Sequence, residues 1–237
     1  MSGHSKWSTI KRQKGLADAK RGAVFTKIGN QIAIAARGGA DPTLNSTLAM
    51  VIEKAKAANM PQSNIQRAID RVADKSAAQL EEITYEAYGP GGIGIIIETA
   101  TDNRNRTFPE VRHALTKNGG TVAEPGSVAF QFERKGIIHV QATGEDALLA
   151  VLDAGAEDAQ EEDGELIVYT DSKALAQVRE AINASALTVT SAELGYVPKT
   201  NVPVTGEETI AKVLKVLDAL DDLDDVTNVH TNADIQE

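Results

Sequence analysis

Hydrophobic side chains recur at helical spacing through residues 16–72, and this period predicts helices with one apolar face each. Gly38-Gly39 ends the first helix, Asp41-Pro42 has the composition that begins a second, and Met60-Pro61 ends that one. Ser63 can cap the third helix. Short connections between the helices predict a compact antiparallel bundle. The three apolar faces consist of Val24, Phe25, Ile28, Ile32 and Ala35, then of Leu44, Leu48, Val51, Ile52 and Ala55, and finally of Ile65, Ile69 and Val72.

The pattern changes to that of strands near Ala77. Residues 83–88 alternate between apolar and polar side chains, which is typical of a half-buried strand, and residues 93–99 are apolar enough for a buried strand. The predicted order is a strand at 83–88, a glycine-rich turn at 89–92, a strand at 93–99, a polar loop at 101–107, a helix ending near Lys117 and a strand at 127–132.

A second α/β unit begins at Gly136. Its order of elements, β-α-β-β-α-β, is typical of ferredoxin-like domains. A helix at 207–220 and a strand at 226–230 follow, and they are too short to bury a core of their own. We therefore expect the last strand to complete the sheet that begins near residue 80. The predicted unit has a strand at 137–141, a helix at 145–154, an acidic turn or edge strand at 157–165, a strand at 166–169, a helix around 175–182 and a strand at 188–197.

These patterns predict an α+β fold, made of an N-terminal helical bundle plus two small α/β (ferredoxin-like) domains, the third domain being inserted into the second. A chain of 237 residues is long enough for two or three small domains. The predicted domains are a basic helical domain at 1–76, a split α/β domain at 77–133 plus 200–237, and an inserted ferredoxin-like domain at 134–199.

Composition limits the location and the chemistry of the protein. The chain has no cysteine, which excludes disulfides, thiol chemistry and cysteine-ligated zinc, and which is typical of a reducing compartment. Apolar runs such as Ile93–Ile97 are too short to span a bilayer. The basic N-terminus is not followed by the apolar segment of a secretory signal. We therefore expect a cytoplasmic protein with no membrane partner.

Charge is divided unevenly along the chain. Residues 1–75 hold 8 Lys and 5 Arg against 5 acids, a net charge of +8, whereas the whole chain has 24 basic and 34 acidic residues. Residues 76–237 therefore hold 11 basic against 29 acidic residues, a net charge of −18. A basic end on an acidic chain is typical of a protein that meets a polyanion. The expected partner is a nucleic acid, either DNA or ribosomal RNA on the ribosome.

The positive charge is densest in residues 2–28, which we call the basic segment, where seven basic side chains face one acid, Asp18. Lysine and arginine neutralise phosphates and release counterions, and the indole of Trp7 can stack on an unpaired base. The alternatives are a solvated helix face and, for Trp7, an apolar anchor for the segment. The predicted nucleic-acid contacts are Lys6, Trp7, Lys11, Arg12, Lys14, Lys20, Arg21 and Lys27.

A second candidate contact is the polar segment 101–107. Arg104 and Arg106 stand among asparagines, between a strand and a helix N-terminus, where a guanidinium group can bind phosphate bidentately and where anions are favoured. No excess of acids stands beside them in the sequence. The same segment can instead be a hydrogen-bonded brace between strand and helix. Arg112, in the following helix, is a further candidate contact.

Other chemistries find little support in the residues. The four histidines show no metal-ligand spacing, and the aspartates within 221–225 lack the glycine and final glutamate of an EF-hand, so we expect a solvated or capping role for them. No nucleotide-binding or hydrolase motif is present. We expect no cofactor, no metal, no small-molecule substrate and no enzymatic activity. A metal-dependent hydrolase that uses His113 with the aspartates is an alternative from another class.

Long motifs, in order along the whole chain, resemble those of the YebC/PmpR family. The chain departs from the family at Thr47 or Ala49, where members often have arginine, and at residues 108–110, where FPE is unusual after the arginine-rich motif. The motifs that carry the resemblance are GHSKW at 3–7, DAKRG at 18–22, AANMP at 57–61, YGPGG at 88–92, TDNRNRT at 101–107, VRHA at 111–114, KNGG at 117–120, GSVAF at 126–130, AGAED at 154–158 and DDLDDV at 221–226.

The resemblance implies a helical domain followed by two α/β domains, and a cytoplasmic transcriptional regulator that binds DNA. The family is also similar to a mitochondrial activator of translation, which implies a ribosome- or RNA-associated factor as the alternative. The residues do not choose between the two, because no helix-turn-helix, zinc finger or aromatic RNA-binding motif is legible. The negative charge beyond residue 75 would repel a duplex lying across the body, so we expect contact at one edge or on a ribosome. A monomer is expected.

Overall fold

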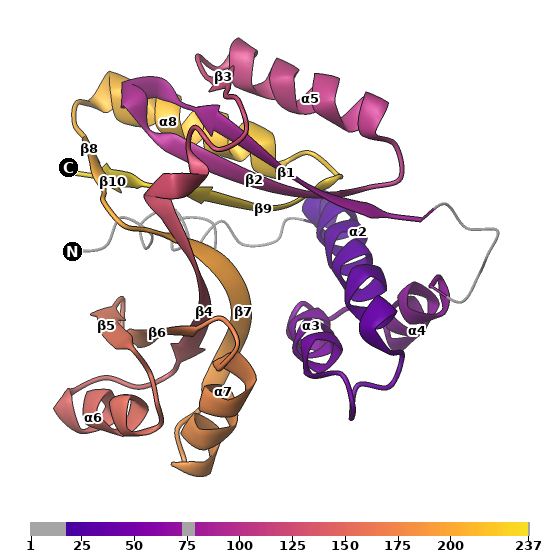
Figure 1. The fold of residues 1–237 in the computed structure, drawn as a ribbon, viewed down its shortest axis with the longest axis vertical. Helices are drawn as coiled ribbons and strands as arrows, with labels where there is room; N and C mark the ends of the chain where they lie inside the picture. Colours follow the sequence, from indigo (N-terminus) through magenta and orange to yellow (C-terminus); the bar gives the residue numbers. More distant parts are fainter. Residues whose placement is uncertain (1–17, 73–78, 237) are drawn as a thin grey trace.

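The computed structural model describes residues 18–72 and 79–236, which form an α+β protein as the sequence predicts (Figure 1). A four-stranded sheet and its two helices lie at the top of Figure 1. The N-terminal helices lie below it on the right, and a second four-stranded sheet with its own helices lies below it on the left.

The described part of the N-terminal bundle has three α-helices, α2 at Asp18–Ala35, α3 at Ser46–Ala57 and α4 at Gln62–Asp70, and the short 310 helix η1 at Ala36–Gly38 extends α2. Most of their apolar side chains meet as the periodicity predicts, because side chains three or four residues apart lie on one face, but Val72 is 42% exposed. In the described ranges, no helix is both long and apolar enough to cross a membrane. The bundle core contains Ile28, Ile32, Leu48, Ala55, Met60, Ile65 and Ile69.

The predicted caps of the second and third helices are wrong. Asp41 forms a turn in which its carboxylate accepts hydrogen bonds from the backbone N–H and the hydroxyl of Thr43, at 2.9 and 2.7 Å. The second helix begins four residues later, because Asn45 caps it by accepting from the backbone N–H three residues on, at 3.0 Å. Leu44 is consequently 87% exposed rather than buried. Ser63 lies inside α4.

The first sheet is antiparallel, with the strand order β3-β1-β2-β9. The last strand, β9, pairs with β2, so it completes the sheet as expected from the sequence. The sequence pattern did not predict β3 or β10, since two or three residues carry no readable period. The bounds are Glu81–Tyr88 for β1, Pro90–Gly92 for the 310 turn η2, Gly94–Thr101 for β2, Thr121–Val122 for β3 and Val226–Thr231 for β9, with a small parallel pair of β8 at Val202–Val204 and β10 at Ala233–Ile235.

Two helices, α5 at Arg104–Lys117 and α8 at Glu207–Asp221, pack against one face of the first sheet (Figure 1). The burial of this apolar layer, at about 25 cal/mol per Å², is the main term that holds helices and sheet together. The layer includes Val111 and Leu115 from α5, Val213, Val216, Leu217 and Leu220 from α8, and Ile95, Ile97, Val226 and Val229 from the strands.

Two predicted elements next to this sheet are wrong. Segment 101–107 is not a loop throughout, because β2 ends at Thr101 and α5 already begins at Arg104. Residues 127–132 are not a strand but contain the 310 helix η3 at Ala129–Gln131. The cause lies in Glu86, whose buried carboxylate accepts three backbone hydrogen bonds and so holds the segment in a tight loop. The donors are the N–H groups of Gly126, Val128 and Ala129, at 2.6, 2.6 and 2.7 Å.

The second sheet has the strand order β5-β6-β4-β7, all neighbours antiparallel, and two helices cover it. The order of elements is the predicted β-α-β-β-α-β. Gly136 is required here, because a Cβ at this position would lie 2.3 Å from the hydroxyl of Thr170 and 2.9 Å from Leu175. The elements are β4 at Phe132–Val140, α6 at Glu145–Asp153, β5 at Asp158–Glu162, β6 at Glu165–Asp171, α7 at Leu175–Ala184 and β7 at Val189–Pro198.

Strands β4 and β7 connect the two sheets. They pair from Val140 and Val189 to Phe132 and Pro198, so the chain leaves the first sheet and returns to it through two adjacent strands. Phe132 packs with Ile96 on the face of the first sheet that α5 and α8 do not cover. β4 therefore runs through the predicted domain boundary near residue 134. The division into three domains stays a prediction.

Helix α3 contacts the second sheet as well as its own bundle. Met50 packs into the hydrophobic core of the second sheet. Lys54 forms a salt bridge with Glu193 of β7 at 2.7 Å, and Arg179 of α7 forms one with Glu53 at 2.7 Å. The bundle thus packs directly against the second sheet and its helix α7.

The predicted insertion can be tested with the fragment 132–198, which contains the whole β4–β7 pairing. We expect it to show a mixed α/β circular dichroism spectrum and cooperative thermal unfolding by itself, because its six elements bury their own core. Deletion of residues 200–237 should instead expose the apolar face of the first sheet and raise the binding of a hydrophobic dye. An unfolded fragment beside an intact deletion variant would contradict the insertion.

Glu86→Gln should lower the free energy of unfolding by about 1–3 kcal/mol, the usual loss when a buried charged acceptor is replaced. Burial alone would raise the pKa of Glu86, but the hydrogen bonds from Gly126, Ala129 and Val128 outweigh it, and the pKa is lowered. The carboxylate therefore stabilises the fold above its ordinary pKa, and the contribution is lost as pH falls through the lowered value. Urea unfolding at pH 7 and pH 3 should show a smaller loss for the variant than for the wild type.

Candidate functional site

Most of the predicted nucleic-acid contacts lie at the start of the chain. Lys6, Trp7, Lys11, Arg12 and Lys14 are outside the described residues, and so are the side chains of Lys20 and Arg21. The structure therefore describes the surroundings of four predicted contacts, which are Lys27, Arg104, Arg106 and Arg112.

Lys27 lies on α2 and contacts the end of α8. Its ammonium group donates to the backbone carbonyl of Asp221 and lies 3.6 Å from the carboxylate of the same residue. A cation at the C-terminus of a helix interacts favourably with the exposed carbonyls there. The Lys27 side chain is only 12% exposed, so it joins the bundle to the first sheet rather than projecting into solvent.

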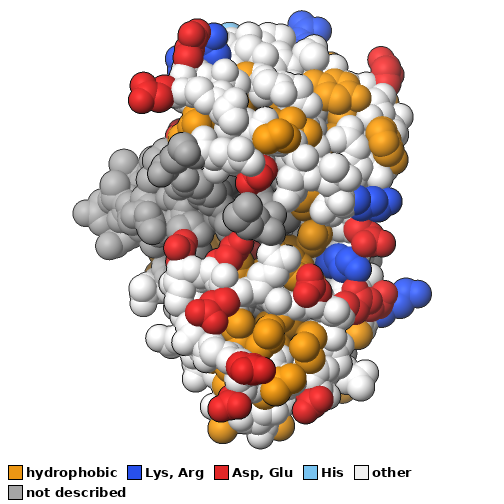
Figure 2. Space-filling model, turned by 90° about the vertical axis from the view of Figure 1, so that its left-hand side faces the viewer, with side chains coloured by type: hydrophobic (Ala, Val, Ile, Leu, Met, Phe, Trp, Pro, Cys, Tyr) orange, Lys and Arg blue, Asp and Glu red, His pale blue; other side chains and the backbone are white. Residues whose placement is uncertain are grey.

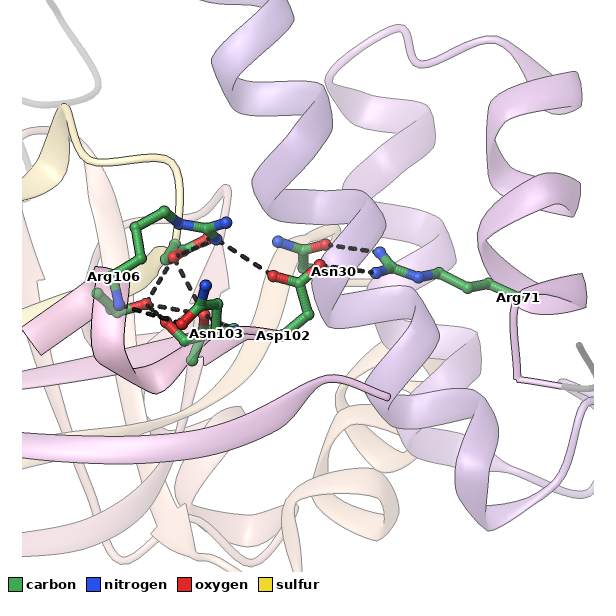
Figure 3. Close-up of polar contacts among 8 residues, drawn as sticks. Asn30, Arg71, Asp102, Asn103 and Arg106 are labelled. Carbon is green, nitrogen blue, oxygen red and sulfur yellow. Dashed lines mark hydrogen bonds and ion pairs between the residues drawn. The ribbon is translucent and has the colours of Figure 1, made fainter. Parts of the chain in front are cut away.

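Arg106 is held by two carboxylates (Figure 3). One terminal nitrogen donates to both carboxylate oxygens of Asp225, at 2.9 and 2.7 Å, and lies 3.3 Å from Asp102. The hydrogen bonds and the charge of Asp225 raise the pKa of Arg106. Charge-assisted pairs of this kind are among the stronger protein hydrogen bonds.

The carboxylate of Asp225 is the centre of this cluster. It is 7% exposed and also accepts from the hydroxyls of Thr101 and Thr107, at 3.1 and 2.6 Å. The side chain of Asn103 caps α5 by accepting from the N–H of Arg106 at 3.2 Å. The end of β2, the start of α5 and the turn before β9 are thereby tied together. The sequence predicted a solvated or capping role for this aspartate, and a solvated role is wrong because the carboxylate is buried.

The same cluster reaches the helical bundle. Arg71, just after α4, lies 3.8 Å from the carboxylate of Asp102 and donates to the side chain of Asn30 on α2 at 3.4 Å. Figure 3 shows the row of side chains from Arg106 through Asp102 and Arg71 to Asn30. Polar contacts therefore connect the first sheet to the bundle across the space between them.

A cavity of about 590 Å³ adjoins this row and is acidic. Two arginines, Arg71 and Arg106, face five carboxylates there. The sequence shows no excess of acids beside segment 101–107, but the fold adds three aspartates from the turn after α8. This geometry favours the brace for Arg106, and its contact with phosphate stays a prediction. The five acids are Asp102, Glu110, Asp222, Asp224 and Asp225.

Arg104 and Arg112 differ from Arg106 in their surroundings. Both are exposed on α5, and no salt bridge involves either of them within residues 22–72 and 79–236. Of the three arginines predicted around this helix, these two have guanidinium groups that remain available to a partner.

A second cavity, of about 310 Å³, lies where the bundle and both sheets meet. Glu98 forms its wall and pairs with His230 at 3.0 Å and with Asn228 at 3.1 Å. Burial, which would raise the pKa of Glu98, is outweighed by these partners, so the pKa is lowered. Sequence reasoning missed this pair, although an acid inside the apolar run Ile93–Thr101 is a legible signal. The described residues hold no group of three or more side chains suited to a metal ion.

The helical bundle joined to two antiparallel sheets defines a class of three-part α+β proteins. Family models describe the TACO1/YebC N-terminal domain at residues 5–75 and the TACO1/YebC second and third domain at residues 80–233. The chain belongs to the TACO1/YebC family. The resemblance seen in the sequence motifs is thereby confirmed.

The relatives match over nearly the whole chain. A "Probable transcriptional regulatory protein" of Moorella thermoacetica is 49% identical, with 99% of this chain and 96% of that protein covered. A protein of the same description from Frankia casuarinae is 48% identical, with 100% and 97% covered. The crystal structure of a conserved hypothetical protein from Aquifex aeolicus is 42% identical and covers 93% of each chain, with a TM-score of 0.87.

The different roles of Arg104 and Arg106 can be tested by stability. Arg106→Ala should lower the free energy of unfolding by about 1–2 kcal/mol, because Asp225 would remain buried with only hydroxyl partners, although the arginine is partly exposed. The matched variant Arg104→Ala should change it by less than about 0.5 kcal/mol. Urea unfolding of both variants at pH 7 measures the difference, and equal losses would contradict the assignment.

Proposed function

We propose that the protein is a non-enzymatic regulator of gene expression that binds nucleic acid through its basic N-terminal part. The observation that supports this proposal most strongly is the uneven net charge, which is +8 in residues 1–75 and −18 in residues 76–237. The first part attracts a polyanion through its net charge, and counterion release from phosphates supplies the affinity. The names of the relatives support a regulatory role in transcription. The partner in this proposal is DNA. A cytoplasmic location and action as a monomer belong to the same proposal.

The described bundle offers positive charge in addition to that of the basic segment. Lys56 on α3 and Arg67 on α4 are exposed, and neither takes part in a salt bridge within the described ranges. Both can add phosphate contacts to those of the basic segment. This supports contact at the edge of the molecule that the bundle forms.

A ribosome- or RNA-associated translation factor is the second candidate. The observation that favours it is the acidity of the sheet-containing parts. The face seen in Figure 2 carries more acidic than basic side chains. In the lower half of this view, acidic side chains surround a patch of hydrophobic side chains. Such a face repels a long duplex, whereas a ribosome can present protein or solvent to it. The metal-dependent hydrolase has less support, because His113 is exposed on α5, whereas Asp225 is buried and paired with Arg106.

Replacing Lys11, Arg12 and Lys14 together with Ala should weaken nucleic-acid binding. The slope of log K against log salt should fall by about 2–3, because each duplex phosphate contact contributes about 0.9. Titration of a fluorescent DNA duplex at several salt concentrations measures it. Lys212→Ala, which removes an exposed cation of α8 that pairs with Glu208, is the matched control and should leave the slope unchanged. A slope that also stays unchanged in the triple variant would remove the basic segment as the contact.

One experiment distinguishes DNA from the ribosome as the partner. Co-sedimentation with ribosomes and retardation of duplex DNA, both at one salt concentration, are measured for the wild type and the triple variant. Retardation of DNA without ribosome association supports the transcriptional regulator, and the reverse supports the translation factor. Absence of both in the wild type would contradict the proposal as a whole.

A further inference from the structure

The exposed side of α5 carries a row of three unusual side chains. Arg104, Phe108 and Arg112 follow one another at intervals of four residues, so they lie along one edge of the helix. All three are exposed, and the buried face of the helix is made by other residues. Those buried residues are Thr107, Val111, Ala114 and Leu115.

The row lies on the side of α5 that faces away from the acidic cavity. Arg106 and Glu110 line that cavity together with the aspartates of the turn after α8. Arg104 and Arg112 do not line it. The positive charges of Arg104 and Arg112 therefore lie on the edge of α5 opposite the acidic cavity. Glu81 shares the strand face beneath α5, and no salt bridge joins it to either arginine in the described part of the chain.

Phe108 is held in place from below. Its ring lies 5.7 Å from the ring of Tyr85 on β1, centroid to centroid, and the two planes are inclined by 40°. Tyr85 is 9% exposed, whereas Phe108 is 37% exposed. Tyr85 contacts the phenylalanine ring from the protein side, and part of the Phe108 side chain is exposed to solvent. An exposed aromatic ring with a fixed orientation is suited to stacking.

The hydroxyl of Tyr85 adds a second observation at the same place. It is buried and has no hydrogen-bond partner within the described residues. Burial raises the pKa of this group, although the nearby charge of Arg104 acts in the opposite direction. A phenylalanine would pack here without leaving a polar group unsatisfied. Tyr85 thus holds an unsatisfied hydroxyl within range of the charge of Arg104.

We propose that Arg104, Phe108 and Arg112 form a stacking platform for an unpaired base of an RNA, with the two guanidinium groups on the adjacent phosphates. The charge of the row is complementary to a nucleic-acid strand, and base-on-aromatic stacking accepts any base because every base has a flat π face. The spacing of four residues places one cation on each side of the ring. These three residues lie outside the basic segment in sequence.

The geometry selects an unpaired base rather than a duplex. A base inside a duplex is already stacked on both faces and cannot lie on a protein ring without being extruded. Folded RNA presents unpaired bases in loops and bulges, where proteins recognise them by stacking on aromatic and arginine side chains. Cellular DNA is mostly paired. The platform therefore fits an RNA loop, and it rests on the proposed function only in that the partner is a nucleic acid.

The test compares the binding of three probes to the full-length protein. The probes are an RNA hairpin with a six-nucleotide loop, a blunt RNA duplex of the same stem, and the DNA hairpin of the same sequence. Phe108→Leu keeps an apolar side chain over Tyr85 but removes the aromatic face. We expect it to weaken binding of the RNA hairpin by about 5- to 100-fold, the usual loss for one stacked base, with little change for the duplex. Phe108→Trp, which keeps an aromatic face, should bind the RNA hairpin about as tightly as the wild type.

Two further variants make the result specific. Arg104→Ala with Arg112→Ala should lower the salt slope for the RNA hairpin by about 1–1.5, because two single-strand phosphate contacts are lost. Phe130→Leu is the matched control, since Phe130 is an exposed phenylalanine of η3 outside the row, and it should bind like the wild type. Thermal unfolding of each variant checks that the fold is retained.

Each possible outcome either supports or contradicts the proposed platform. Unchanged binding of the hairpin by Phe108→Leu overturns the platform, as does an equal loss in Phe130→Leu. An equal effect of Phe108→Leu on the blunt RNA duplex overturns the assignment to an unpaired base, whereas a loss for the DNA hairpin is expected, because its loop also presents unpaired bases. A wild type that binds duplex DNA through the basic segment but no RNA hairpin overturns this inference and leaves the proposed function standing. A wild type that binds no nucleic acid overturns both.

Discussion

The buried carboxylate of Asp225 is the interaction on which the arrangement of the first sheet depends. It receives hydrogen bonds from residues at the end of β2 and in the first turn of α5, more than a hundred residues earlier in the chain. A buried carboxylate is stable only when its hydrogen-bonding capacity is filled. Thr101, Arg106 and Thr107 fill it, so the turn before β9 and the start of α5 must remain together. Arg106 then extends this restraint through Asp102 to Arg71 and the bundle.

The same restraint explains why Arg104 and Arg106, in one helical turn, have different roles. The first turn of α5 contains no acid of its own, and positive charge is disfavoured at a helix N-terminus. Asp225 and Asp102 offset the charge of Arg106 from outside the helix. For Arg104, the described residues provide no ion-pair partner. An uncompensated cation at such a place is a local conflict, and conflicts of this kind concentrate at functional sites.

The sequence predicts what depends on local pattern and misses what depends on distant partners. The period of three to four residues is sufficient for α2, and the alternation of strands and helices is sufficient for the second sheet. Both Asp41 and Asn45 are good capping residues, and the local pattern does not choose between them. The loop around η3 depends on Glu86, forty residues earlier, so segment 127–132 reads as a strand. Three of the five acids around Arg106 come from the turn after α8, which the sequence separates from it by more than a hundred residues. The departure at Phe108 was visible in the sequence, but only the structure shows that its ring is exposed.

The motif at 101–107 therefore does not act as one site. Thr101 and Thr107 bind the buried carboxylate, Asn103 caps α5, and Arg106 braces the helix against the turn before β9. Arg104 is the basic side chain of the motif that remains exposed without an ion pair in the described structure. Most residues of a run that resembles a phosphate-binding loop in sequence instead form hydrogen bonds that stabilise the fold. The side chains available to a nucleic acid are then those that the fold leaves unpaired, and on α5 these stand beside an aromatic ring rather than inside the acidic cavity.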